Sequence, residues 1–327
     1  MATLVIILIK VAVVLGTLLF LAAYMTWMER RVFGLLQVRY GPNRVGPAGL
    51  LQPIADGIKL MFKESIIPDR ADKLVYFLAP AITLIPALST IAVVPFGDSV
   101  TVMGVKVDLL IADVNVGVLY IFALAGIGVY GIVLAGWASN SKYPLLGGLR
   151  ASAQLISYEL AMGMSLLGVV MISGTLSLKG IVDAQADLPF IVLQPLGFLI
   201  FLVCMMAETN RAPFDLPEAE SELTAGFHTE YSSMHFAMFF LAEYCNLITL
   251  SAVAATFFLG GWRGPVLPPV VWFLLKVVAF MFFFMWLRAT TPRLRYDQLM
   301  AFGWKVLLPL SILNVILTAG VIVLVGF

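Results

Sequence analysis

Acidic residues are concentrated in one short stretch of this otherwise apolar chain, between Glu208 and Tyr231. They are Glu208, Asp215, Glu218, Glu220, Glu222 and Glu230. A single basic side chain, Arg211, accompanies them, and apolar segments of membrane length lie on both sides of the stretch. Carboxylates at the water edge of a membrane protein form either a solvated loop or a site that binds and releases protons. The composition of the stretch leaves both interpretations open.

Two further acids lie inside apolar segments. Counted from the more basic loops, Glu159 is about eight residues into one segment and Glu243 about nine into another, which places them ~12 and ~13 Å deep. An acid at mid-bilayer costs roughly 2.5–3.5 kcal/mol, and burial disfavours its charged form, so such a carboxyl can exchange a proton near neutral pH. The alternative is a pair of protonated acids that stabilise helix contacts. Their matched depth, just below Glu208, favours a proton relay.

The composition identifies a membrane protein that spans the bilayer several times. The 327 residues are 61% hydrophobic and 12% charged, and their mean hydropathy is +1.01. A net charge of +1 gives no indication of a nucleic-acid partner. Cys204 and Cys245 lie in apolar segments without a C-x-x-C pair, so we expect core residues and no metal or iron–sulfur site in this chain.

The elements that position these acids are predicted from apolar windows of about 20 residues. Eight windows occur, at about 4–28, 75–94, 116–137, 151–172, 190–207, 234–259, 270–287 and 304–325. Lipid offers no hydrogen-bond partner to the backbone, and no barrel-like alternation is present. We therefore predict an all-α protein with eight transmembrane helices in a single polytopic membrane domain, residues 1–327.

The orientation follows from the Lys and Arg residues of the connecting loops. They gather in long loops at about 29–74, 138–150, 208–233 and 288–303. These loops are expected in the cytoplasm, with both termini on the outer (periplasmic) side. Lys276 lies inside a predicted span, where we expect it to pair with an acid of this chain or of another.

The first cytoplasmic loop contains a predicted amphipathic helix at 51–65. Leu51, Ile54, Ile58, Met61 and Phe62 fall on one face, and polar residues fall on the other. The periodicity predicts a helix that lies at the membrane surface. It serves either as a surface anchor or as the rim of a lateral opening for a substrate dissolved in the membrane, and spacing alone favours the anchor.

Several long motifs resemble the H subunits of bacterial complex I, the proton-pumping NADH:quinone oxidoreductase, whose mitochondrial equivalent is the first membrane subunit. The resemblance covers essentially the whole chain in order. It rests on ERR at 29–31, RYGPNRVGPAGLLQPIADGIKLMFKE at 39–64, GWASNSKYPLLGGLRASAQLISYE at 136–159, AETNRAPFDLPEAESEL at 207–223, GFHTEYSSMHF at 226–236, AEY at 242–244, FLGGWRGPVLPP at 258–269 and RATTPRLRYDQLMAFGW at 288–304.

The resemblance implies a quinone chamber built together with partner subunits. These partners are the subunit with the terminal iron–sulfur cluster, the hydrogenase-like large subunit and small membrane-arm subunits. Quinone, as ubiquinone or menaquinone, would enter from the lipid past the amphipathic helix, with Glu29, Arg30, Arg39 and Asp56 at the entrance and chamber. NADH, FMN and the iron–sulfur clusters would belong to the partners, and the complex would lie in the bacterial inner membrane (the mitochondrial inner membrane for an organellar protein).

The resemblance also implies that the acids form a water-linked relay from this chamber. Its members would be Glu159, Glu208, Glu218, Glu220, Glu222, Glu230 and Glu243. Arg211 would keep part of this array ionised, and Asp215 would support it. Some relatives carry another glutamate in the third span, where this chain has Gly126, which leaves the role of that span open.

Other functions are considered beside this one. A homologous subunit of a membrane-bound hydrogenase or of a ferredoxin-using complex would lack the quinone-side motifs, which are intact here. A proton-coupled transporter is disfavoured because no inverted halves are apparent. A purely structural anchor would leave the buried acids unexplained.

Overall fold

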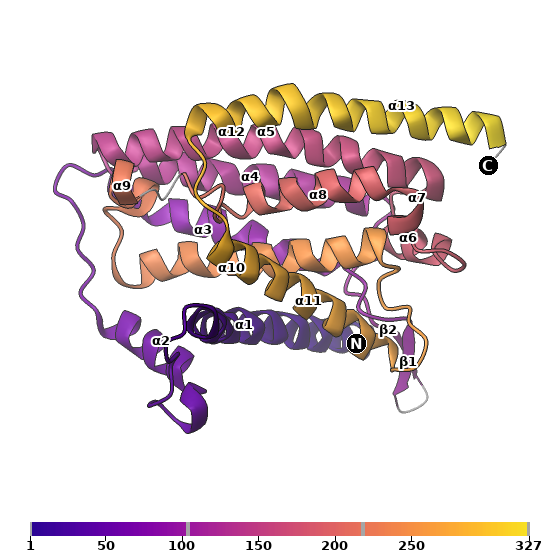
Figure 1. Cartoon of the computed structure of the whole chain (residues 1–327). Coiled ribbons are helices and arrows are strands. Elements are labelled where there is room, and N and C mark those ends of the chain that lie inside the picture. Colours follow the sequence, from indigo (N-terminus) through magenta and orange to yellow (C-terminus); the bar gives the residue numbers. More distant parts are fainter. Residues whose placement is uncertain (1, 103–104, 217–219, 326–327) are drawn as a thin grey trace.

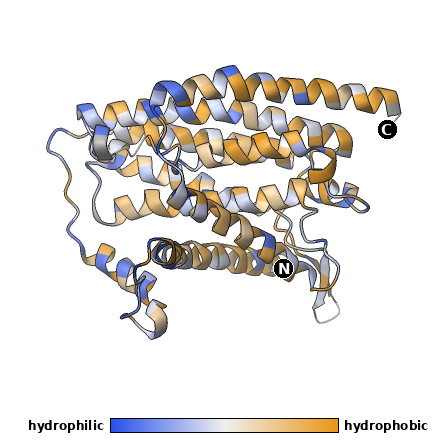
Figure 2. Cartoon of the chain, viewed as in Figure 1, coloured by the Kyte–Doolittle hydropathy of each residue, from blue (hydrophilic) through white to orange (hydrophobic). Residues whose placement is uncertain are grey.

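The computed structural model describes residues 2–102, 105–216 and 220–325. Within them the chain is an all-α membrane protein, and long helices lie side by side in one bundle (Figure 1). Seven described helical segments are long and apolar enough to cross a membrane. They are built on α1 (Ala2–Leu36), α3 (Lys73–Ser89), α4 (Gly117–Ala138), α5 (Lys142–Ser173), α10 (Ser233–Phe258), α11 (Pro269–Thr290) and α13 (Leu308–Val325). Apolar residues predominate along these helices (Figure 2).

The predicted span at 190–207 forms two helices, α7 (Phe190–Leu193) and α8 (Pro195–Glu208). Gln194 separates them with a non-helical backbone (φ −128°, ψ 53°), and Pro195 has no N–H to continue the ladder of hydrogen bonds. The 14 residues of α8 are about 21 Å long, less than the other spans. Glu208 is its last residue.

Several helices extend beyond their apolar windows. The first continues from the predicted end at 28 to Leu36, and α5 begins at Lys142 instead of 151. Helix α5 ends at Gly174, whose positive φ of 66° is the left-handed conformation that commonly terminates a helix. The long α5 therefore carries Glu159 and also reaches the loop between α8 and α10.

Helices of the bundle approach one another closely at small residues. Gly131 of α4 lies so close to α3 that a Cβ there would be 2.1 Å from Thr83 Oγ1. Helix α5 contacts α4, α8 and α13, and α10 contacts α3 and α11. In contrast, α1 packs on α10, α11 and α2 and exposes apolar residues such as Val5, Leu8 and Val13.

Short elements lie at the two ends of the bundle. One end carries α2 (Gln52–Phe62) and α9 (Glu220–Leu223), and the other carries α6 (Leu178–Ala184), the strands β1 (Ser99–Val102) and β2 (Val105–Asp108), and the first and last described residues (Figure 1). The strands pair antiparallel, with Ser99 opposite Asp108. This hairpin is not among the predicted elements, because a search for long apolar windows does not detect strands this short. A short π-helix, η4 (Gly303–Leu307), joins α12 (Tyr296–Phe302) to α13.

The predicted amphipathic helix is confirmed as α2, with its bounds at Gln52–Phe62 inside the predicted 51–65. Ile54, Ile58, Met61 and Phe62 are all exposed, with half or more of each side chain's surface accessible. The 3-10 turn η1 (Pro47–Gly49) precedes α2 and redirects the chain after α1. The apolar face of α2 is thus turned away from the protein core, as expected of a helix at a membrane surface.

Candidate functional site

A buried arginine lies at the start of the acidic loop, immediately after α8. Arg211 is 3% exposed, and its guanidinium donates from Nε to Glu243 Oε1 at 2.8 Å and from Nη1 to Glu29 Oε2 at 2.9 Å. Burial by itself lowers the pKa of Arg211, but the carboxylates of Glu243 and Glu29 outweigh it and hold that pKa well above its usual value. The side chain is therefore always charged and bridges α1 to α10.

Two more side chains complete this ion cluster. The Tyr244 hydroxyl donates to Glu29 Oε2 at 2.8 Å, and its ring lies under the guanidinium, 4.5 Å from Arg211 Cζ. Arg288 of α11 forms an ion pair with Glu29 Oε1. The cluster formed by Glu29, Arg211, Glu243, Tyr244 and Arg288 thus joins α1, the acidic loop, α10 and α11. The sequence predicted that Arg211 would keep acids ionised, but its partners come from distant helices and not from its own loop.

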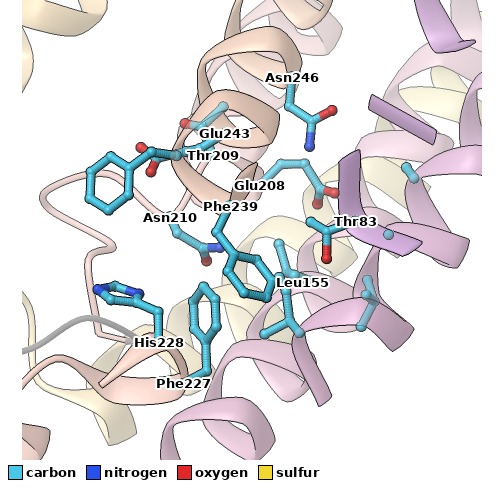
Figure 3. A pocket seen from close by; sticks show the side chains of 15 residues that line it. Thr83, Leu155, Glu208, Thr209, Asn210, Phe227, His228, Phe239, Glu243 and Asn246 are labelled. Atoms are coloured by element: carbon cyan, nitrogen blue, oxygen red, sulfur yellow. The ribbon is translucent and has the colours of Figure 1, made fainter. Parts of the chain in front are cut away.

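A cavity of about 50 Å³ lies beside the cluster, between α3, α4, α5, α8 and α10. Its polar lining residues are Thr83, Glu208, Thr209, Asn210, His228, Glu243 and Asn246 (Figure 3). A buried water requires roughly 10–15 Å³ of such space, so the cavity has room for about three to five waters. Glu243 belongs to both the ion cluster and the cavity wall, because it accepts a hydrogen bond from Arg211 and also lines the cavity.

Glu159, on α5, lies near Glu208, the last residue of α8. Glu208 Oε2 is buried without a hydrogen-bond partner among the described residues, and the Glu159 carboxylate is near enough to interact with it electrostatically. Glu159 is half-buried and faces α4, where a Cβ on Gly126 would be 4.0 Å from Glu159 Oε1. The third span therefore borders Glu159 although it contributes no acid.

Gln154 of α5 holds the start of the acidic loop in place. Its side-chain Nε2 donates to the carbonyls of Ala207 and Phe214, each at 2.9 Å, and to Asn210 Oδ1 at 3.2 Å. The side chain is fully buried. This residue is not among those predicted for the site. The signal available in the sequence was a lone glutamine five residues before Glu159, close to the start of an apolar segment.

Phe227, Phe239 and Phe240 line the cavity, and further aromatic residues pack behind them, with Tyr231 against Phe239 at 5.0 Å between ring centroids. Tyr76 of α3 and Tyr231 stack with ring centroids 4.1 Å apart. Pro80 cannot donate to the Tyr76 carbonyl, and the Tyr231 hydroxyl donates to that carbonyl instead, at 3.3 Å. His228, in the 3-10 turn η3 (Gly226–His228), packs against Phe227, and burial lowers the pKa of its imidazole to about 4. The ring is therefore neutral at pH 7. His228 is also absent from the predicted site residues.

Glu222 and Glu230 of the predicted relay, and the supporting Asp215, do not line the cavity. Glu222 forms an exposed ion pair with Arg150 at 2.6 Å, and Asp215 accepts from Arg293 at 2.8 Å. Burial raises the pKa of Asp215 and the bond from Arg293 opposes that rise. The main-chain carbonyl of Glu230 accepts from the Tyr76 hydroxyl at 2.8 Å. Glu218 and the side chain of Glu220 lie outside the described residues.

The residues expected at the quinone entrance occupy the junction of α1 and α2. Arg30 donates to Asp56 Oδ2 at 2.6 Å, which ties the end of α1 to α2. Glu29, the residue before Arg30, is buried in the ion cluster. Arg39 lies farther out on the connecting loop and donates to Gln37 Oε1 at 2.6 Å. Glu29 and Arg30 thus connect the α2 junction to the ion cluster within two consecutive residues.

The expectation that Lys276 pairs with an acid is wrong for the part of this chain that the structure describes. Its ammonium donates to three backbone carbonyls beyond the end of α10, those of Leu259 at 2.6 Å and of Gly261 and Arg263 at 2.8 Å. The last carbonyls of a helix and of the turn after it have no partner in the helix, so a cation there is well placed. Among the described residues, no group of three or more His, Cys, Asp or Glu could hold a metal ion.

Comparisons with known proteins identify the family of this chain. A family model described as NADH dehydrogenase matches residues 9–319. The H subunit of the NADH-quinone oxidoreductase of Syntrophotalea carbinolica is 58% identical over 318 residues, 97% of this chain and 96% of that protein. The second H subunit of Geobacter sulfurreducens is 57% identical over 316 residues (97% and 96%), and the H subunit of Thermomicrobium roseum is 56% identical over 316 residues (94% and 93%). The chain therefore belongs to the NADH dehydrogenase family, as an H subunit of NADH-quinone oxidoreductase.

Proposed function

We propose that this membrane-arm subunit forms the quinone entrance and part of the quinone chamber, and relays protonation changes from the chamber into the membrane through buried carboxylates. One observation carries the proposal. Arg211 binds Glu29, next to the α1–α2 junction, and Glu243, which lines the cavity that also contains Glu208. A continuous set of charged groups therefore links the predicted entrance to the interior of the bundle.

The relay is driven by the charge change that accompanies quinone reduction. A quinone that accepts two electrons also takes up two protons, so the field at Glu29 and Arg30 changes during the reaction. Arg211 is shared between Glu29 and Glu243, so a change at one carboxylate alters the other. Glu243, Glu208 and Glu159 then redistribute protons as coupled sites, whose proton affinities belong to the set.

Partner subunits supply the electrons and close the chamber. We infer that the partners are the terminal iron–sulfur cluster subunit, the hydrogenase-like large subunit and small membrane-arm subunits. NADH, FMN and the clusters belong to these partners, and the substrate of this subunit is a ubiquinone or a menaquinone. The α2 end of the bundle, with exposed basic residues such as Arg30, Lys59 and Lys63, is the face proposed for them.

We further propose eight membrane crossings in the bacterial inner membrane, with the α2 end in the cytoplasm. The first and last described residues lie at the same end of the bundle (Figure 1). Seven crossings would place them at opposite ends, so the short α7–α8 segment has to count as the eighth. The loops rich in Lys and Arg, at the α2 end, support the cytoplasmic assignment.

The test compares three variants in the assembled complex. Glu208→Gln and Glu159→Gln remove a titratable proton from the proposed relay, and Asp183→Asn removes an exposed acid that pairs with Arg263 at the opposite end of the bundle. We expect proton-coupled quinone reduction to fall about tenfold or more in the first two variants. Asp183→Asn should resemble the unmodified complex, and all three should assemble.

The measurements are inhibitor-sensitive quinone reduction and proton uptake by membrane vesicles, with assembly checked by the size of the detergent-solubilised complex. Full activity together with full proton translocation in both relay variants would refute the relay.

A further inference from the structure

A second, smaller cavity continues from the first toward the opposite end of the bundle. Its volume is about 30 Å³, and it lies between α3, α4 and α10. It shares Glu208 and Asn246 with the first cavity and extends to Thr249 and Thr90. Figure 3 shows Glu208 close to Asn246 and Thr83 and on the far side of Phe239 from His228. Glu208 is therefore positioned where the two cavities meet.

Two buried polar atoms on the wall of the second cavity have no hydrogen-bond partner among the described residues. They are Glu208 Oε2 and Thr249 Oγ1, and Thr249 is 1% exposed. Its neighbours on α10 differ, because Ser251 and Thr256 donate to the carbonyls four residues earlier at 2.7 and 2.8 Å. A buried hydroxyl without a partner is costly, and a water in an adjacent polar cavity removes that cost.

The rest of the wall provides the partners that such water requires. Thr83 and Thr90 donate their hydroxyl protons to the carbonyls of Ala79 and Pro86, at 3.1 and 2.7 Å, and their oxygens remain able to accept. Asn246 adds an amide that both donates and accepts. A volume of about 30 Å³ holds about two waters, each with two to four polar neighbours.

We propose that Asn246 and Thr249 are positioning residues that hold a short water chain against Glu208 Oε2, so that Glu208 passes protons from the first cavity to the second. The ionised carboxylate takes a proton from a water in the first cavity, so one water O–H bond breaks as one carboxyl O–H bond forms, and protonated Glu243 on the same cavity returns a proton to the hydroxide that is left. The carboxyl O–H bond then breaks as a water in the second cavity gains one O–H bond, and that water passes its excess proton along the water chain. This inference rests on the proposed function and extends the relay beyond Glu208, toward the outer half of α3 and α10.

The test uses hydroxyl and amide deletions on α10. Thr249→Val and Asn246→Leu remove the groups that hold the water, and Thr249→Ser restores a hydroxyl. Thr256→Val is the matched control, because this buried threonine on the same helix donates to Ala252 and lines neither cavity. Each complex is assayed for protons translocated per NADH oxidised, for the rate of quinone reduction, and for the infrared carboxyl band that Glu208→Gln abolishes.

We expect Thr249→Val and Asn246→Leu to shift that carboxyl band and to lower proton translocation per electron about two- to tenfold, the effect of losing one hydrogen bond. Thr249→Ser should recover both, and Thr256→Val should change neither. Suppose that both deletion variants show an unshifted carboxyl band and normal proton translocation while Glu208→Gln is impaired. That result would overturn the role of the second cavity and leave the proposed relay intact. Normal function in Glu208→Gln would remove the relay itself.

Discussion

Arg211 is the residue whose surroundings most constrain the site. Its guanidinium satisfies one carboxylate from α1, 182 residues away in sequence, and one from α10, 32 residues away. Two buried acids and the one arginine between them are costly to desolvate, and the geometry offsets this cost only while all three are present. Removal of the cation would leave Glu29 with Arg288 and Tyr244, and would leave Glu243 without its charged partner.

We predict that Arg211→Met destabilises the subunit by about 3–5 kcal/mol, the range for one partner removed from a buried ion pair. Arg211→Lys should retain the charge but lose the planar fork that reaches two carboxylates, and should fall between Met and Arg. Thermal unfolding of the detergent-solubilised complex measures the effect.

The matched control for this prediction is Arg263→Met, whose ion pair with Asp183 has side chains 39% and 55% exposed. An exposed pair of this kind contributes less than about 1 kcal/mol. Equal destabilisation by the Arg211 and Arg263 variants would contradict the role assigned to the buried cluster.

For individual residues, the sequence indicated which acids belong to the site but not which side chains they interact with. Glu159, Glu208 and Glu243 were identified because acids in apolar segments require a reason. Their partners depend on which faces of separate helices meet, and spacing along the chain does not specify that. Gln154 and Asn246 were missed for a related reason: an isolated polar residue in an apolar segment becomes informative only when the cavity or loop it faces is known. His228 was missed because its position in a loop gave no sign that its ring is buried.

The helices were predicted mainly by their length. A run of about 20 apolar residues has one stable conformation in lipid, so the long spans appear close to their predicted positions. The predicted ends of the helices are less accurate, because α1 and α5 continue as helices past the apolar windows into more polar sequence, where hydropathy carries no signal. The break at Gln194 and the β1–β2 hairpin depend on local backbone geometry, which hydropathy also does not report.

Lys276 shows how one side chain stabilises the junction between two elements. Its ammonium donates to three carbonyls of the turn between α10 and α11, and a buried glutamine supports the same turn. Gln185 donates to the carbonyl of Thr256 at 2.8 Å and accepts from the N–H of Gly260 at 2.9 Å. Three carbonyls would lose their donor at once if the ammonium were absent.

We predict that Lys276→Met lowers stability by about 1–3 kcal/mol because these buried carbonyls lose their shared donor. Thermal unfolding of the complex is again the measurement, and Lys305→Met, an exposed lysine on the π-helix η4, is the control with little expected change. Quinone reduction by the assembled Lys276→Met complex at low temperature should stay normal, because the turn lies at the end of the bundle opposite α2. A loss of turnover without a loss of stability would show that Lys276 acts in the reaction.

The two ends of the bundle carry different elements. One end carries α2 and α9, whereas the opposite end carries α6 and the β1–β2 hairpin (Figure 1). The contacts of Gln185 and Lys276 are made at the turn after α10. The chain passes from α6, at the opposite end of the bundle, to the loop after α8, at the α2 end (Figure 1). The α7–α8 segment makes this passage, and it is therefore the proposed eighth crossing.

We predict that the two ends of the α7–α8 segment lie in different compartments. Single cysteines at Asp187, before α7, and at Thr229, after α8, are both exposed positions. A membrane-impermeant maleimide applied from outside should label Asp187→Cys at once and Thr229→Cys only after permeabilisation. Val266→Cys, 85% exposed between α10 and α11, is the positive control for the outer side. Equal labelling of the Asp187 and Thr229 variants from outside would contradict the crossing.

The shared guanidinium has a thermodynamic consequence that does not depend on any path for protons. Glu29 and Glu243 both bind Arg211, so occupancy near one and protonation of the other are linked equilibria. Linkage is reciprocal: if a molecule bound beside Glu29 changes the proton affinity of Glu243 by some factor, protonation of Glu243 changes the affinity for that molecule by the same factor. The affinity for a ligand at the α1–α2 junction should therefore report the charge state of a carboxylate on α10.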